Sequence, residues 1–108
     1  MRQWTTPWEE LTVEGVDLTQ NQKIKVTYSQ GSKVITFLHD DLDMSLDEEG
    51  NTVILVHFSQ TQSGSLSPNS YCEVEVNWID SNGERGATEI AKIPIDRNLL
   101  KEVMTWSD

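Results

Sequence analysis

Apolar and polar residues alternate more regularly over residues 72–78 than elsewhere in the chain. The even-numbered positions from Cys72 to Trp78 are apolar, and the odd-numbered positions between them are two glutamates and an asparagine. A period of two is typical of a β-strand that buries one face and exposes the other to water. The pattern therefore predicts a half-buried strand whose even-numbered side chains enter the core.

A turn sequence follows this strand directly. Asp80-Ser81-Asn82-Gly83 contains the Asn-Gly pair that favours a tight turn, and a second extended run from Ala87 to Ile95 comes after it. Two extended runs joined in this way predict an antiparallel hairpin. The chain is therefore expected to belong to the all-β class.

Further extended runs precede the hairpin. The run Thr52–Ser59 is apolar on both faces between Val53 and Val56, which is typical of a central strand. Leu42–Leu46 alternates weakly inside the acidic stretch Asp40–Glu49 and predicts an edge strand, where charges discourage pairing with other chains. The remaining runs are Trp8–Val13, Lys23–Ser29 and Lys33–Leu38, and the pattern of the last leaves its buried face undecided.

Two segments depart from the period of two. Residues 60–69 are rich in Ser, Gln, Gly and Pro, and they predict a linker that can carry a helical turn anchored by Leu66. Near the end of the sequence the apolar spacing is helical, which predicts a short helix or an irregularly docked tail. The residues of that pattern are Asn98, Leu99, Leu100, Val103 and Met104.

Together these elements predict one domain over residues 1–108. About seven strands with frequent turns favour an antiparallel β-sandwich of immunoglobulin-like appearance, with a short C-terminal helical tail. A chain of 108 residues can bury a core without disulfides. The single cysteine, Cys72, lies on an apolar strand face and is expected to be a small core residue, so the paired cysteines of true immunoglobulin domains are missing.

The charge of the chain limits its partners. Eighteen acidic and eight basic residues give a formal net charge of −10, and the basic residues are scattered along the sequence. Nucleic-acid binding needs clustered Lys and Arg side chains, so the sequence argues against it. The acidity favours either a surface that resists non-specific association or one complementary to a basic partner subunit.

No stretch of the sequence predicts a membrane span or a signal peptide. A span needs about 18 apolar residues, and the N-terminal residues lack the apolar core of a secretion signal. We therefore expect no membrane partner and a cytoplasmic site of synthesis and assembly.

One cluster of charged residues suggests chemistry. His39 stands beside Asp40, Asp41 and Asp43, but adjacent residues of a strand point to opposite sides, and the spacing does not fit a Ca²⁺ loop of the EF-hand type. A solvated acidic loop over residues 40–49 is the expectation, with a specific cation site as the alternative.

The sequence contains no recognisable catalytic motif. It has no glycine-rich phosphate loop, nucleophile elbow or His/Cys metal spacing, and His57 is expected to be a surface or core residue rather than a ligand. The prediction is a protein that is not an enzyme, with no catalytic, cofactor or metal residues.

Four tryptophans are many for this length, and Trp78 is expected in the core. The other three lie near the two ends of the chain, which are often close together in small domains. They can pack over one end of the sandwich, serve as exposed contacts for a partner, or form a carbohydrate platform. The candidate partner contacts are therefore Trp4, Trp8 and Trp106.

The order and spacing of short motifs over residues 2–104 also resemble a family. The motifs are Arg2-Gln3-x-Thr5-Thr6-Pro7, Lys25-Val26-Thr27-Tyr28-Ser29-Gln30-Gly31, Gly50-Asn51-Thr52-Val53, Ser59-Gln60-Thr61-Gln62, Val74-Glu75-Val76, and Ile93-Pro94-Ile95 with Leu99-Leu100. In this respect the chain resembles the small acidic all-β proteins encoded in prophages of Firmicutes near tail and baseplate genes.

The resemblance implies a non-enzymatic phage structural or accessory protein that is associated with the tail or baseplate. Its partners would be other phage structural subunits or further copies of itself, in the virion or in the bacterial host cytoplasm during assembly. The alternative is a free-standing β-sandwich binding module for a host-surface ligand such as a glycan.

Overall fold

The computed structural model describes residues 1–106. Almost all of its regular structure is β, with one short α-helix, α1 (Gln60–Gly64), and a 3₁₀ turn at His39–Asp41. The strands are β1 (Trp8–Val13), β2 (Ile24–Gln30), β3 (Lys33–Leu38), β4 (Leu42–Leu46), β5 (Thr52–His57), β6 (Ser70–Ile79), β7 (Arg85–Ala87) and β8 (Ala91–Ile95).

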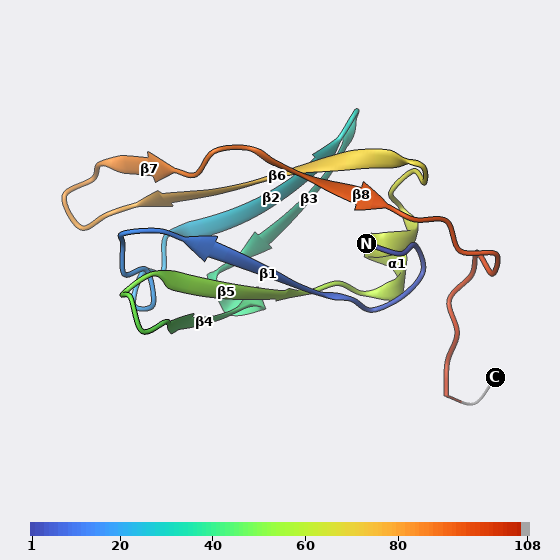
Figure 1. The fold of residues 1–108 in the computed structure, drawn as a ribbon, viewed down its shortest axis with the longest axis horizontal. Coiled ribbons are helices and arrows are strands. Elements are labelled where there is room, and N and C mark those ends of the chain that lie inside the picture. Colours follow the sequence, from blue (N-terminus) through green and yellow to red (C-terminus); the bar gives the residue numbers. More distant parts are fainter. Residues whose placement is uncertain (107–108) are drawn as a thin grey trace.

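The strands form two sheets that pack face to face. One sheet has the order β1-β5-β4, and the other has the order β3-β2-β6-β7, with β8 also paired to β6. All pairings between these strands are antiparallel, and Figure 1 shows the two sheets as separate layers. The order matches an immunoglobulin-like sandwich without its first strand, because β1-β5-β4 corresponds to B-E-D and β3-β2-β6 corresponds to C′-C-F. The predicted all-β sandwich is confirmed.

The alternation over residues 72–78 places side chains as predicted. Cys72, Val74 and Val76 are buried, and Trp78 is partly buried. In the β2–β6 pairing, Val26 stands opposite Val76 and contributes to the same inner face. In β3, the inner face is the one that carries the buried Phe37, which decides the question that the sequence left open.

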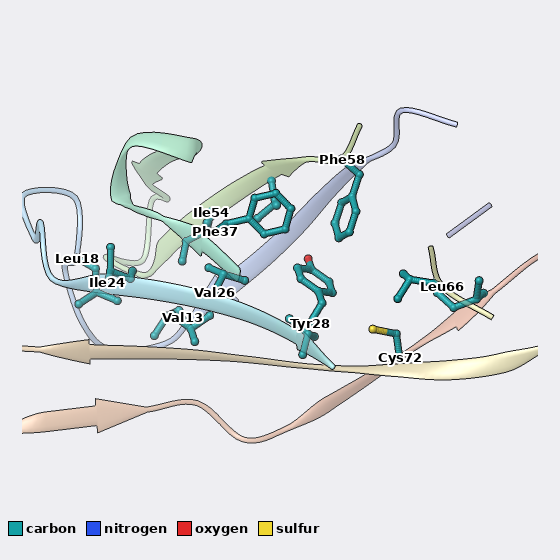
Figure 2. Packing of buried hydrophobic residues seen from close by; sticks show 14 residues of the cluster. Val13, Leu18, Ile24, Val26, Tyr28, Phe37, Ile54, Phe58, Leu66 and Cys72 are labelled. Atoms are coloured by element: carbon teal, nitrogen blue, oxygen red, sulfur yellow. The ribbon is translucent and has the colours of Figure 1, made fainter. Parts of the chain in front are cut away.

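Aromatic rings fill the space between the sheets (Figure 2). The ring of Tyr28 meets Phe58 edge-on with centroids 4.7 Å apart, and it meets Phe37 at 5.9 Å. Edge-to-face contacts of this kind add to the free energy of simple burial. Cys72 lies beside this cluster, fully buried, as expected for a core cysteine.

One end of the sandwich is closed by residues from both ends of the chain and by α1; we call it the closed end. The backbone N–H of Gln3 donates to the carbonyl of Asp96 at 2.9 Å, and the N–H of Asp96 donates to the carbonyl of Met1 at 2.7 Å. The side-chain amide of Gln3 is buried and donates to the carbonyl of Leu66. Leu66 is 1% exposed, so it anchors the linker as predicted.

The second half of the predicted hairpin is interrupted. The sequence predicts one run over Ala87–Ile95, whereas pairing begins at Arg85 and the strand breaks between β7 and β8. The break has a local cause: Thr88 uses both its side-chain oxygen and its backbone N–H to bond the backbone of Val76, each at 3.0 Å. At Val76, these two bonds with Thr88 take the place of the regular backbone hydrogen bonds between β6 and its partner strand.

Of the two expectations for the C-terminal segment, the described residues show the irregular tail and not the short helix, because residues 97–106 contain no helix. A helix this short is marginal unless an apolar surface covers it, and Leu99 remains 82% exposed. The segment instead runs irregularly away from the body (Figure 1). Gln60 contacts it through its side-chain amide, which accepts from the N–H and donates to the carbonyl of Met104, both at 2.7 Å, and the side chain of Asn98 donates to the carbonyl of Gln3 at 3.1 Å. We call residues 97–106 the arm.

Among residues 1–106, no helix has the length and apolar character needed to cross a bilayer.

Candidate functional site

A groove of about 750 Å³ lies on the five-stranded sheet at the end opposite the closed end. It is lined by residues 22–25 from the start of β2, residues 38–40 after β3, residues 77–79 from the end of β6, and Arg85 of β7. In Figure 1 this region lies near the projecting β6–β7 hairpin. The β2–β3 hairpin and the β6–β7 hairpin, which are far apart in the sequence, therefore contribute to one concave surface.

The register shows which lining residues share a face. Lys25 stands directly opposite Leu38 on one side and Asn77 on the other. Ile79 stands opposite Arg85 in the next row of the same face. Directly opposed residues in antiparallel strands point to the same side of a sheet, so these five side chains lie together on its outer face.

The groove concentrates positive charge in an acidic protein. Lys23, Lys25 and Arg85 line it, and they are three of the eight basic residues of the chain. Within residues 1–106, no carboxylate lies within 4.0 Å of any of these three cationic groups, and the contact of this length between a basic and an acidic side chain joins Nδ1 of His39 to Oδ1 of Asp40 at 3.1 Å. The guanidinium of Arg85 donates to Oδ1 of Asn77 at 3.0 Å, which directs it across the sheet.

The sequence did not predict this cluster, because the basic residues are scattered along the chain. The pairing of β2 with β6, and of β6 with β7, brings Lys25 and Arg85 to one surface. The predicted hairpin after Trp78 indicates part of this cluster, since it would place Arg85 near Ile79. The sequence pattern alone does not show that β2 pairs with the other side of β6 and adds Lys25.

The three candidate tryptophans have different surroundings. Trp4 is partly buried and covers Gly64 so closely that an added Cβ there would lie 2.3 Å from the indole. Trp8 is 58% exposed, and its ring stacks on His57 with centroids 4.1 Å apart. Trp106 projects from the arm and is fully exposed. No aromatic contact joins these three rings to one another in the described part of the chain, and their role as partner contacts remains a prediction.

The arm carries most of its apolar side chains in contact with solvent. The exposed apolar side chains of the arm are those of Leu99, Leu100, Val103, Met104 and Trp106. Exposed apolar side chains in a continuous segment mark interaction sites more often than isolated ones do.

The groups whose pKa is raised are buried or half-buried and lie outside the groove. Burial raises the pKa of the Cys72 thiol, so this thiol is protonated and unreactive at neutral pH. Burial also raises the pKa of the Tyr28 hydroxyl, whose oxygen has no hydrogen-bond partner among the described residues. Glu9 faces the same interior from β1, and burial raises the pKa of its carboxyl, partly offset by the N-terminal amine.

No group of three or more His, Cys, Asp or Glu side chains within residues 1–106 is arranged to hold a metal ion. The acidic side chains of residues 40–49 are exposed, and Asp47 is held by its own turn, where it accepts from the N–H groups of Glu49 and Asn51 at 2.9 Å. These hydrogen bonds lower the pKa of Asp47, with the bond from Asn51 contributing most.

Comparison of the chain with protein-family models, with curated proteins and with solved structures returns no significant match.

Proposed function

We propose that the chain is a non-enzymatic structural or accessory subunit of a phage particle, associated with the tail or baseplate, that acts through protein–protein contacts. The observation that carries this proposal is the arm, because it presents five apolar side chains to solvent without regular structure of its own. The phage assignment rests on the resemblance of the sequence motifs described above.

The shape of the molecule supports a role for the arm in assembly. The radius of gyration is 15.0 Å, larger than the roughly 13 Å expected for a compact domain of this length. Burying the exposed apolar groups of the arm in a neighbouring subunit would recover about 25 cal/mol for each Å² removed from water. An extended segment of this kind is suited to lie along a sheet edge or in a groove of its partner.

The sandwich would hold the arm in place. The two hydrogen bonds between Gln60 and the backbone of Met104 hold the arm near its far end relative to α1, and the bond from Asn98 to Gln3 holds it near its start. A segment that is already oriented loses less entropy on binding than a free one. The partners would be other phage structural subunits or further copies of the same chain.

The first test is the position of the gene, since a location among tail genes supports the proposal and a location in a metabolic operon contradicts it.

The second test uses a triple variant, Leu99→Ser with Val103→Ser and Met104→Ser, and Ile90→Ser as a matched exposed control outside the arm. Copurification with neighbouring tail proteins, and self-association by light scattering, should both be measured.

We expect the triple variant to lose copurification or self-association at least about tenfold, because its apolar contacts are removed. Its fold should be unchanged by circular dichroism, since these side chains are exposed in the isolated chain. Association that survives in the triple variant at the level of Ile90→Ser would rule out the arm as the contact.

A further inference from the structure

We infer that the groove binds an oxyanion, either a carboxylate or a phosphate, carried by a ligand the size of one or two sugar rings. The inference does not depend on the subunit role, because the groove and the arm share no residues. It rests on three unpaired cations, an oriented amide and two exposed apolar side chains on one surface.

The cations are close enough to act on one ligand. Lys25 and Asn77 are directly opposed across β2 and β6, so their Cβ atoms lie about 5 Å apart. Arg85 reaches over Asn77 to make its hydrogen bond at 3.0 Å, which brings the guanidinium toward the row that contains Lys25. A planar guanidinium with a neighbouring ammonium can bind both oxygens of a carboxylate or two oxygens of a phosphate.

These charges have no counter-charge in the empty protein. Lys25 on β2 and Arg85 on β7 flank β6, and no described carboxylate lies within 4.0 Å of either cationic group. The rest of the chain is strongly acidic, so carboxylates were available as partners elsewhere on the surface. An anionic ligand would supply the missing counter-charge.

The size and the apolar part of the groove indicate what carries the anion. A volume of about 750 Å³ lies in the range of sites for small molecules. Leu38 and Ile79 flank the cations and are 51% and 47% exposed, so each offers an apolar surface to the face of a ring. A sugar acid or a sugar phosphate combines one anionic group with such a ring face.

The surroundings argue against a polyanion. Asp40 lies on the wall of the groove, and Glu75 is the next outward-facing residue before Asn77 on β6. Together with the net charge of −10, these carboxylates would repel a chain of phosphates, whose binding scales with the number of cations engaged. The groove is therefore suited to one or two negative charges and not to nucleic acid.

The test is a titration of the ¹⁵N-labelled full chain at low ionic strength, followed by NMR. The probes are sodium glucuronate, glucose 1-phosphate and uncharged glucose. We expect saturable shifts of the amides of Lys25, Asn77 and Arg85 with at least one charged probe, and none with glucose. Binding of glucuronate alone would identify a carboxylate ligand, and binding of glucose 1-phosphate alone would identify a phosphate ligand.

The variants are Arg85→Gln and Lys25→Gln, with Lys92→Gln as the matched control. Lys92 is an exposed lysine on β8, where it stands opposite Glu73, outside the groove. Loss of one charge-assisted hydrogen bond should weaken binding about tenfold in each groove variant. The control should change binding less than about twofold, since it alters only the net charge.

Several results would overturn the inference: shifts that do not saturate, equal binding of glucose, or equal weakening by Lys92→Gln. Both groove residues are exposed, so their variants should fold, and a thermal melt checks this. If Arg85→Gln does not fold, Lys25→Gln alone decides, because Lys25 makes no side-chain hydrogen bond within residues 1–106.

Discussion

At the closed end of the sandwich, the buried Gln3 donates hydrogen bonds to the carbonyls of Leu66 and Asp96, whereas at the groove end Lys25 and Arg85 face solvent without a carboxylate partner. The closed end also contains the N-terminal segment and α1. The groove end contains mainly strand ends and the 3₁₀ turn.

The contrast separates two uses of polar residues. At the closed end, the backbone N–H and side-chain NH₂ of Gln3 are paired with backbone carbonyls, so they stabilise the packing of segments that would otherwise leave the core open, although Oε1 of Gln3 is buried without a partner among the described residues. At the groove end, polar groups are left available, so they contribute little to stability and can bind something else. Stability and recognition are therefore expected to respond to different substitutions.

The largest expected difference comes from two leucines, one at each end. Leu66→Ala should lower the free energy of unfolding by about 2–5 kcal/mol, because a fully buried side chain is removed and a cavity remains. Leu38→Ala should change it by less than about 0.5 kcal/mol, because Leu38 is half exposed. Urea unfolding of both variants measures this difference, and similar losses in the two would remove the contrast between the ends.

A smaller difference is expected from two glycines that each lie beneath a tryptophan. A Cβ at Gly64 would lie 2.3 Å from the ring of Trp4, and one at Gly86 would lie 2.4 Å from the ring of Trp78. Gly64→Ala should cost about 1–3 kcal/mol through overpacking at the closed end. Gly86→Ala should cost less, because β7 is a three-residue edge strand that can bend outward. Thermal unfolding ranks the two, and a larger loss for Gly86→Ala would contradict the ranking.

The smallest effect concerns the pH dependence of stability. Burial raises the pKa of Glu9 above its ordinary value of 4.5, so the folded state binds more protons than the unfolded state between these two values. Stability from this group therefore falls as the pH rises through that window, and the loss persists at pH 7. Glu9→Gln should raise the urea midpoint at pH 7 and leave it nearly unchanged near pH 4.

The outward-facing neighbour provides the control for this experiment. Glu10→Gln removes the same charge from an exposed position on the same strand, so it should alter the midpoint by similar small amounts at both pH values. A pH-independent change in Glu9→Gln would show that the exchange of carboxyl for amide itself, and not ionisation of a buried carboxyl, is responsible. The pKa of Asp47 is lowered, so its contribution to stability increases with pH, opposite to that of Glu9. Because Asp47 is present in both variants, it does not affect their comparison.

The strands and the class of the fold could be predicted from the sequence because a period of two is a local signal. The edge strand Leu42–Leu46 and the central strand near Val53 and Val56 were both predicted from local composition. The helical tail was wrong because apolar spacing predicts a helix only where a surface covers it, and nothing in the isolated chain covers Leu99.

The groove could not be predicted, because it depends on which strands become neighbours. The outward-facing residues of β2 and β6 are polar in both strands, and this pattern is compatible with several pairings. Only the register shows that Lys25 stands opposite Asn77 and that the guanidinium of Arg85 can donate to Asn77.

The sheet order also determines how fast this chain can fold. β1 pairs with β5 and β2 pairs with β6, so these two ladders join segments that are distant in sequence, while the hairpins β2–β3, β4–β5 and β6–β7 are local. Closing such long loops costs entropy before any apolar contact repays it, and folding on the millisecond-to-second scale is expected. During that interval the unpaired β5 would expose its apolar run, so renaturation should be most efficient at low protein concentration.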